Sequence, residues 1–221
     1  MTRSDTGDHD WPILDSKTEY ETDWYDSGYD LVEQPDGSEK RYYWAALPDA
    51  VVVIARIDAT LVDSLDSANT EQAELDTNRV ETDTNRGDTS RNGGDTPDHL
   101  LFVEQYRPTI RNAHLELPAG IVEDGESYTA AAARELEEET GFSPSNLALL
   151  QEYAVATGVL RHNRAVVYAD GLEPGERQLD SNEFLTVTTV PVTEAIDRAR
   201  KQPANDSTLS ALLLAEHDGL L

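Results

Sequence analysis

Charged residues that could hold a metal ion are crowded into one short stretch of this sequence. They are Arg134, Glu135, Glu137, Glu138 and Glu139. Positions three and four apart lie on one side of a helix, so the Glu135 carboxylate would converge with those of Glu138 and Glu139. Hard divalent cations prefer oxygen ligands, and magnesium typically takes one or two carboxylates together with substrate phosphates. Composition alone leaves one alternative, which is a solvated acidic face of a helix.

The helix that would carry these carboxylates has its own packing pattern. We predict a helix over residues 126–140, in which Tyr128, Ala132 and Leu136 form an apolar stripe that can pack on a sheet. Like charges four residues apart destabilise a helix, so we expect arginine, metal ions or both to offset them. Gly141 is a natural residue to end the helix.

The spacing across residues 120–142 resembles the signature of the Nudix hydrolase family. Gly120 is followed by Glu126 and then by the run RELEEETGF at 134–142, so every defining position of the signature is matched. Glu126 is expected to be structural. The resemblance implies an α/β fold, namely an α/β/α sandwich around a mixed sheet, here with an N-terminal antiparallel β extension.

The resemblance also implies a magnesium- or manganese-dependent hydrolase of a nucleoside diphosphate linked to another moiety. It assigns metal binding to Glu135, Glu139 and the backbone carbonyl of Ala119, with Glu138 as a further ligand directly or through water. Arg134 would help to orient these carboxylates. Metal ions in such a site can hold the attacking water, neutralise phosphoryl oxygens and support the leaving group.

Flanking segments resemble the ADP-ribose pyrophosphatase branch, although enzymes acting on other nucleoside diphosphate sugars share them. The runs concerned are residues 13–17, 47–53, 104–108 and 116–120. The resemblance implies a homodimer, with N-terminal strands exchanged or packed between subunits, that cleaves ADP-ribose to AMP and ribose 5-phosphate. The alternatives are hydrolysis of another sugar nucleotide or a dinucleotide, a non-catalytic Nudix sensor, and an interaction protein.

Residues outside the signature are predicted, by the same resemblance, to bind the substrate. Trp24 or Tyr25 would stack on adenine, with an ordinary interface aromatic as the alternative. Arg107 would bind a substrate phosphate, which suits its fixed fork of donors, with a surface salt bridge as the alternative. Glu116 lies near the metal site in relatives and is grouped with these residues. His114 shares its strand face, and we expect a structural histidine rather than a ligand.

The resemblance also predicts a general base in the loop 171–184. Glu183 aligns best, and Asp180 and Glu176 are alternatives. A metal-bound water could instead be deprotonated with help from Glu138. The candidate catalytic residues are therefore Glu138 and Glu183.

The segment 156–164 departs from the branch. Relatives often have a Pro-Gly-containing stretch followed by an acidic residue where this chain has Arg161 and Arg164. These arginines could contact phosphate or ribose, or lie on the surface. The departure leaves the sugar-side moiety of the substrate open.

The elements that must position these residues are mostly strands. Strand-forming runs at 18–20, 29–32 and 41–44, with a Pro-Gly turn at 34–37, predict an N-terminal antiparallel unit over 12–46. Two nearly continuous apolar runs, at 50–57 and 99–105, predict strands buried on both faces. We also predict strands at 113–117, 147–155, 165–169 and 184–190, and helices at 192–201 and 207–217, the last capped by Asp206.

Residues 61–98 differ in kind from the rest of the predicted Nudix domain, which spans 47–221. They contain ten acidic residues against three arginines, and they repeat the motif Asp-Thr-Asn-Arg. Such a composition cannot bury enough apolar surface to offset chain entropy. We therefore predict a disordered acidic insertion in a hairpin, with a partner-binding loop as the alternative. Residues 1–11 are predicted to be a disordered terminus.

The whole chain of 221 residues is strongly acidic. It carries 17 Lys and Arg against 44 Asp and Glu, a net charge of −27, and it has no cysteine. This charge argues against a general electrostatic grip on nucleic acid or on an anionic membrane. The absence of cysteine excludes a disulfide scaffold, a zinc finger and a cysteine nucleophile.

The distribution of the acid indicates its role. The 61–98 insertion holds a minority of the net charge, so most of the acid belongs to the folded surface and not to one tail. This composition resembles that of halophile proteins, which work in molar salt. No stretch approaches the ~18 apolar residues that span a bilayer, and residues 1–10 have no apolar signal core. We expect a soluble, cytoplasmic protein.

Overall fold

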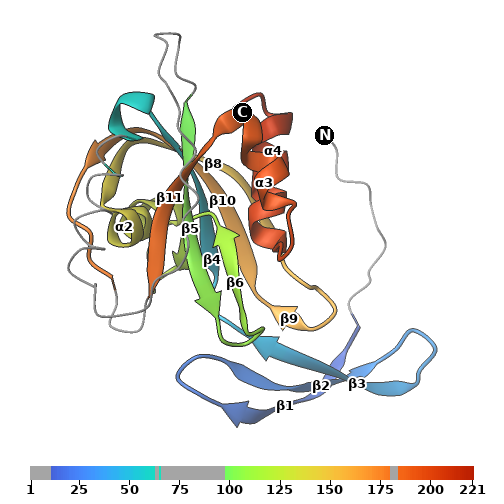
Figure 1. Ribbon diagram of the computed structural model, residues 1–221. Coiled ribbons are helices and arrows are strands. Elements are labelled where there is room, and N and C mark those ends of the chain that lie inside the picture. Colours follow the sequence, from blue (N-terminus) through green and yellow to red (C-terminus); the bar gives the residue numbers. More distant parts are fainter. Residues whose placement is uncertain (1–10, 63–64, 66–97, 180–183) are drawn as a thin grey trace. The chain divides into compact units, whose positions relative to one another are not determined.

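The computed structural model describes residues 11–62, 65, 98–179 and 184–221. The chain divides into two compact units (Figure 1), which are Met1–Ala50 with Glu152–Arg164, and Val51–Gln151 with Ala165–Leu221. Most of the predicted disordered terminus and acidic insertion lies outside the described residues. The predicted start of the insertion at residue 61 is wrong, because residues 61, 62 and 65 are helical and their apolar side chains pack with the core of the second unit. None of the described helices is long and apolar enough to cross a membrane.

The first unit is built on a four-stranded sheet in the order β1-β2-β3-β9. The strands are β1 (Ile13–Glu21), β2 (Asp26–Glu33), β3 (Glu39–Ala46) and β9 (Leu160–Arg161). The first three pair antiparallel, whereas β9 pairs parallel to β3. The β2–β3 turn closes with a hydrogen bond from the Gly37 amide to the Gln34 carbonyl at 2.8 Å, and Gly37 has a φ of +80°. The predicted antiparallel β extension is confirmed.

The second unit holds a seven-stranded sheet. Five strands follow the order β11-β5-β4-β10-β8, while β6 pairs with β5 and β7 pairs with β4. The strands are β4 (Ala50–Ile57), β5 (His99–Arg107), β6 (Asn112–Glu116), β7 (Ala119–Ile121), β8 (Phe142–Ala154), β10 (Asn163–Pro174) and β11 (Leu185–Pro191). The predicted strand 50–57 is confirmed with the same bounds.

The central strand β4 contributes to both faces of the sheet. Residues 51–55 are at most 2% exposed, as predicted for a strand buried on both sides. Val51 and Val53 belong to a core cluster that includes Ala132 and Leu136 of α2 (Tyr128–Thr140). Val52 and Ile54 are equally buried outside this cluster, and alternation directs them to the other face of the sheet.

Helices cover both faces of this sheet. Figure 1 shows α2 on one side, and α3 (Ala195–Ala199) and α4 (Asp206–His217) on the other. A hydrogen bond from the Leu117 amide to the Thr208 hydroxyl, 3.1 Å long, ties α4 to the chain that follows β6. The unit is therefore an α/β/α sandwich, and the predicted fold class is confirmed.

Element boundaries differ from the predictions where a neighbouring side chain or strand decides them. Helix α2 begins at Tyr128 and not at residue 126, because Ser127 is extended and its side chain accepts a hydrogen bond from the Ala130 amide. Asn205, not Asp206, caps α4 by accepting from the Thr208 amide at 2.8 Å.

Two further elements also depart from the predicted pattern. The predicted helix over 192–201 is divided into the 3-10 turn η1 (Val192–Glu194) and the short α3. The sequence Pro118-Ala119-Gly120 is typical of a turn, yet residues 119–121 form β7 because they pair with β4.

Candidate functional site

The acidic residues of the site are carried by α2, whose ends are defined by its own sequence. Ser127 satisfies the Ala130 amide at 3.2 Å at the first turn. At the other end Gly141 adopts the left-handed conformation, with a φ of 76°, and donates to the Glu137 carbonyl. The predicted terminator is confirmed, and the helix presents the Glu135–Glu139 turn as an intact unit.

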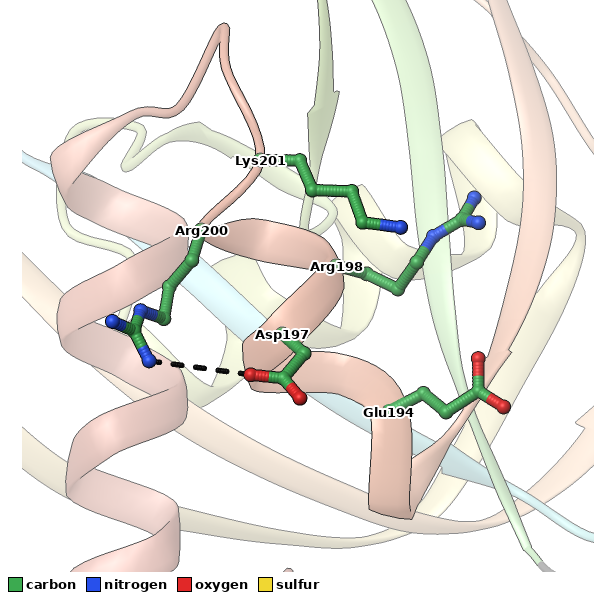
Figure 2. A pocket seen from close by; sticks show the side chains of 5 residues that line it. All are labelled: Glu194, Asp197, Arg198, Arg200 and Lys201. Atoms are coloured by element: carbon green, nitrogen blue, oxygen red, sulfur yellow. Dashed lines mark ion pairs between the residues drawn. The ribbon is translucent and has the colours of Figure 1, made fainter.

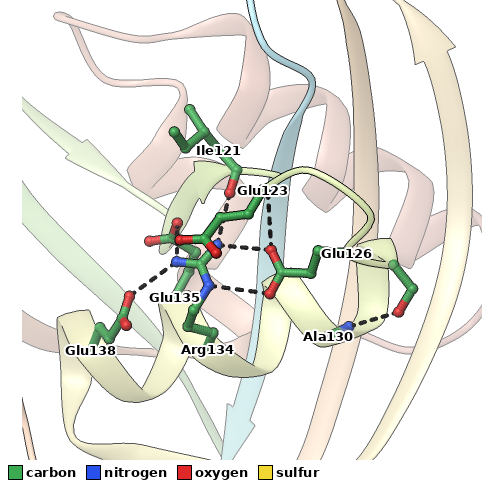
Figure 3. A network of polar contacts seen from close by, with 8 residues as sticks. Ile121, Glu123, Glu126, Ala130, Arg134, Glu135 and Glu138 are labelled. Atoms are coloured by element: carbon green, nitrogen blue, oxygen red, sulfur yellow. Dashed lines mark hydrogen bonds and ion pairs between the residues drawn. The ribbon is translucent and has the colours of Figure 1, made fainter.

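The guanidinium of Arg134 contacts three carboxylates, those of Glu126, Glu135 and Glu138 (Figure 3). Arg134 donates to both carboxylate oxygens of Glu126, at 3.0 and 3.1 Å, and to Glu135 at 2.8 Å. It also donates to Glu138 at 3.1 Å and to the Ile121 carbonyl at 2.9 Å. Arg134 therefore orients these carboxylates and fastens α2 to the preceding loop.

These contacts shift the pKa values of Glu126 and Arg134. Hydrogen bonding to Arg134 holds the pKa of Glu126 below its usual range. Hydrogen bonding to Glu126 raises the pKa of Arg134 above its ordinary value. Glu126 thus stays ionised and structural, as its place at the start of the helix predicts.

Glu135 and Glu139 are the buried carboxylates of α2. They are 8% and 3% exposed, and they lie one helical turn apart. The Glu139 Oε2 atom accepts a hydrogen bond from the Ala119 amide at 3.2 Å, which brings the 119–120 backbone against this face of the helix. Burying carboxylates is costly unless they are paired with cations or hydrogen-bonded.

Gly120 permits that close approach. A Cβ atom at this position would lie 1.9 Å from the Glu135 Cδ atom and about 2 Å from both carboxylate oxygens. Only glycine can therefore leave the Glu135 carboxylate where it is. The first glycine of the sequence motif is explained by packing against the proposed metal ligand.

The three glutamates of the predicted metal site differ in exposure, and Glu135 and Glu139 are the buried ones. Glu138 is partly open, with a side chain 41% exposed, and is held by Arg134. Within the part of the chain that the structure describes, no three His, Asp or Glu side chains are grouped closely enough to hold a metal ion as they stand. The donor chemistry nevertheless fits a hard cation, because two buried carboxylates each lie against the backbone of residues 119–120 and three carboxylates contact one arginine.

Two predicted substrate residues, Arg107 and Glu116, contact each other across paired strands. The Arg107 Nη2 atom lies 2.5 Å from Glu116 Oε2, and Arg107 Nε lies 3.2 Å from each carboxylate oxygen. Glu116 is 6% exposed, whereas the Arg107 side chain is 40% exposed. The arginine is thus anchored by a buried carboxylate and still reaches the surface.

His114 is buried on the same strand as Glu116. It is 5% exposed, and neither ring nitrogen has a hydrogen-bond partner among the described residues. From the sequence, a structural histidine is expected here. A structural histidine would have its ring nitrogens satisfied, so this one requires a separate explanation.

The predicted adenine-stacking residues belong to the first unit. Trp24 and Tyr25 follow β1, and their side chains are 59% and 36% exposed. The Thr22 hydroxyl accepts from both of their backbone amides, at 3.2 and 2.9 Å, and donates to the Tyr25 carbonyl. A rigid turn therefore presents both rings to solvent.

Arg161 is held inside a polar cluster of the first unit. It pairs with Asp30 and lies 4.0 Å from the centre of the Trp44 ring. Asp30 also accepts from the Ser16 hydroxyl at 2.8 Å and from the Trp44 indole. Burial raises the pKa of Asp30, but hydrogen bonds from Ser16, Arg161 and Trp44 outweigh it and hold that pKa below its usual range.

The structure describes only one of the three candidate general bases in the loop 171–184. Glu183 and Asp180 lie outside the described residues, whereas Glu176 is exposed after β10.

In the same segment Arg177 contacts the site, a role that was not predicted from the sequence. Its Nε atom donates to the Glu139 carbonyl at 2.7 Å and its Nη2 atom to the Leu185 carbonyl at 2.9 Å. No sequence motif marks Arg177, because its partners are backbone atoms distant along the chain.

A surface pocket is lined by residues that are distant in sequence from those of the predicted site. Charged side chains of η1 and α3 and of the turn after them line it (Figure 2): Glu194, Asp197, Arg198, Arg200 and Lys201. Arg200 is paired with Asp197 at 4.0 Å, and both side chains are mostly exposed. The pocket contains none of the residues predicted for catalysis.

Comparisons with known proteins agree with this arrangement. The NUDIX domain family matches residues 91–212. A methanol dehydrogenase activator of Bacillus methanolicus is 33% identical over 110 residues, which are 49% of this chain and 60% of the activator. An ADP-ribose pyrophosphatase of Bacillus subtilis strain 168 is 31% identical over 110 residues, again 49% of this chain and 60% of the relative.

The fold has a counterpart among solved structures. A crystal structure of an ADP compounds hydrolase superposes with a TM-score of 0.70 over 96% of this chain and 97% of that one, at 20% sequence identity. At this identity the likeness concerns the fold alone. The chain spans about three-fifths of the length of the two relatives above. The NUDIX match extends over more than half of the chain and includes the whole 120–142 motif, so this protein belongs to the NUDIX domain family.

Proposed function

We propose that this protein is a metal-dependent hydrolase of the pyrophosphate bond in a nucleoside diphosphate sugar, with ADP-ribose as the leading substrate and AMP and ribose 5-phosphate as products. Family membership and the similarity to an ADP-ribose pyrophosphatase support the proposal. The observation that carries it is the burial of Glu135 and Glu139 one turn apart, against the backbone at Ala119 and Gly120. A purely solvated acidic helix face would leave these carboxylates exposed.

The proposed metal ligands are Glu135, Glu138, Glu139 and the Ala119 carbonyl. A bound Mg²⁺ or Mn²⁺ would neutralise phosphoryl oxygens and lower the pKa of a water molecule. The protein's own part is to hold the carboxylates in place. Arg134 holds two of them, and the Ala119 amide holds the third.

The proposed substrate residues supply charge and stacking. Arg107, anchored by Glu116, presents donors that suit a phosphate. Trp24 or Tyr25 offers an exposed ring for adenine. Glu138 or Glu183 would accept the proton of the attacking water, and Glu138 is the exposed carboxylate of the α2 set.

Glu139→Gln tests the proposal directly. The change keeps the side-chain shape and the oxygen that accepts from the Ala119 amide, but removes the negative charge. We expect ADP-ribose hydrolysis with Mg²⁺ in molar KCl to fall at least 100-fold while the thermal midpoint stays close to that of the wild type. Full activity in this variant would refute the metal assignment.

A substrate panel separates the leading substrate from its alternatives. Wild-type protein is assayed with ADP-ribose, other nucleoside diphosphate sugars and dinucleotides, by measuring phosphate after phosphatase treatment of the products. Fast turnover of another compound beside none of ADP-ribose would reject ADP-ribose as the substrate. Tight binding without turnover of any compound would favour the sensor alternative.

We also propose a homodimer built through the first unit. All nine residues of β1 are exposed at one edge of its sheet, and they include Ile13, Leu14 and Tyr20. An exposed edge strand of this length is a template for pairing with another chain. Light scattering after size-exclusion chromatography should give twice the chain mass, and a Tyr20→Glu variant should lower it.

The acidic surface is proposed to be an adaptation to molar salt. Carboxylates of a chain with a net charge of −27 repel one another, and salt screens that repulsion. The buried carboxylates are the exception, because neighbouring protein groups hold them. Most of the acid would then serve solubility and a few glutamates the metal.

A further inference from the structure

His114 carries buried polar atoms that no described part of the chain satisfies. Its side chain is 5% exposed, and neither Nδ1 nor Nε2 has a hydrogen-bond partner among the described residues. Leaving a buried donor or acceptor unpaired costs free energy, whereas an apolar side chain of similar size would pack without that cost. Such a group in a native protein requires an explanation, and a partner from outside the chain is the simplest one.

The pairing of β5 with β6 shows which way His114 faces. Glu116 lies opposite Val103, and His114 lies opposite Gln105. Val103 belongs to the core cluster that packs with α2. Residues opposite each other, and residues two apart along a strand, share a face. His114 and Glu116 are therefore on the face of the sheet that α2 covers.

Arg107 is a third polar residue on this face of the sheet, beside His114 and Glu116. Arg107 lies two residues beyond Gln105 on β5, and hence on the same face, where it pairs with Glu116. An imidazole, a guanidinium and a carboxylate thus occupy neighbouring positions of two paired strands. Arg107 is the residue proposed above to bind a substrate phosphate.

We infer that His114 binds the substrate by donating a ring N–H to an oxygen of the nucleotide diphosphate, beside the contact proposed for Arg107. The inference rests on the proposed function. Imidazole supplies a directed N–H donor, and a phosphate oxygen is a charged acceptor that strengthens such a bond. His114 acts as a binding residue that orients the diphosphate, and it transfers no proton in the reaction.

The test measures stability and ligand binding in His114→Leu. The His114 ring makes no hydrogen bond with the described part of the chain that this variant could lose, so the thermal midpoint should be unchanged or higher. The Kd for the non-hydrolysable α,β-methylene analogue of ADP-ribose, measured by calorimetry with Mg²⁺ in molar KCl, should rise roughly tenfold or more, as expected for the loss of a charge-assisted hydrogen bond. His114→Gln, which keeps an N–H donor, should recover part of that affinity.

His99→Leu is the matched control. His99 begins β5, the strand of Arg107, and its Nδ1 atom is likewise buried with no partner among the residues that the structure describes. It pairs with Ile57 and Pro191, at the opposite end of β5 from Arg107. Its substitution should leave the Kd of the analogue unchanged. A His114→Leu protein that binds as tightly as the wild type, or a His99→Leu protein that is weakened equally, overturns the inference. Failure of the wild type to bind the analogue overturns the proposed function together with the inference.

Discussion

At the scale of single residues, the site depends on close contacts that tolerate few side chains. Gly120 lies against the Glu135 carboxylate, and Arg134 is shared by Glu126, Glu135 and Glu138. One contact is steric and the other is electrostatic. Both act on Glu135, so changes at either position should reach the proposed metal ligand without touching the core.

Gly120→Ala should lower activity far more than stability. The new Cβ would overlap the Glu135 carboxylate, which is the end of a flexible side chain and can swing aside. Displacing a reacting or ligating group by about 1 Å can cost 10²-fold in rate, so we expect a loss of about that size with a thermal midpoint lowered by only a few degrees. Gly158→Ala is the control, since nothing lies within 4 Å of its added Cβ atom. Equal activity in the two variants would contradict the role of Gly120.

Glu126→Gln should reveal a pH-dependent contribution to stability. Hydrogen bonding from Arg134 lowers the pKa of Glu126 in the folded protein. The ion pair therefore stabilises the fold fully above the ordinary glutamate pKa of about 4.3, and this contribution is lost as the pH falls through the folded pKa. We expect the variant to be less stable than the wild type by about 1–3 kcal/mol at pH 7.

Urea unfolding at several pH values checks this sign. The difference between wild type and Glu126→Gln should shrink steadily as the pH is lowered from 5 towards 3. A constant difference over that range would show that the charge of Glu126 does not matter to the fold.

At the scale of elements, the C-terminal turn of α2 is held by groups from elsewhere in the chain. The Ala119 amide donates to the Glu139 side chain, and the segment after β10 contacts the backbone of the same turn. The Gly175 amide donates to the Gly141 carbonyl at 2.7 Å, and Arg177 donates to the Glu139 carbonyl. The helix is thus positioned by backbone contacts as well as by its apolar face.

Arg177→Lys should loosen this attachment. Lysine cannot reproduce the fork that joins the Glu139 and Leu185 carbonyls. We expect a loss of about 1–2 kcal/mol in the free energy of unfolding, consistent with the removal of a charge-assisted hydrogen bond. Chemical denaturation measures it. Arg200→Lys is the control, because its exposed ion pair with Asp197 should contribute little; a control that is destabilised as much would refute the attachment.

At the scale of the whole molecule, charge dominates. The net charge of −27 is distributed along the chain, and the described ion pairs engage only some of the carboxylates. Most of the surface therefore bears mutual repulsion at low ionic strength. At the proposed metal site, by contrast, Arg134 and the Ala119 amide stabilise the carboxylates.

Raising KCl from 0.1 to 2 M should stabilise the protein. The screening length falls from about 10 Å to below 3 Å over this range, which removes most of the repulsion between surface carboxylates. We expect the thermal midpoint to rise by 10 °C or more, as measured by calorimetry. A variant with six exposed acids outside α2 changed to their amides should show a smaller rise. A midpoint independent of KCl in the wild type would contradict salt adaptation.

The sequence by itself determined the family, the signature helix and the central strands. The motif at 120–142 predicted the acidic helix, and the run at 50–57 predicted the buried strand, because helix periodicity and continuous apolar runs are local properties. Ser127 and Asn205 were missed as caps, since a cap depends on the backbone angles of one residue. The sequence motif included Gly120, but only the structure gave its steric reason.

Only the tertiary structure decided which groups meet across the chain. Arg107 reaches Glu116 through strand register, Arg177 reaches the Glu139 carbonyl from a different segment, and the His114 ring has no hydrogen-bond partner in the described ranges. Each of these facts depends on packing between elements far apart in sequence, and backbone carbonyls leave no trace in residue type. Residue types and spacing are sufficient to identify the NUDIX motif. The surroundings that hold the motif, and the buried imidazole on the face of the sheet that α2 covers, follow from the way the sheet and α2 pack.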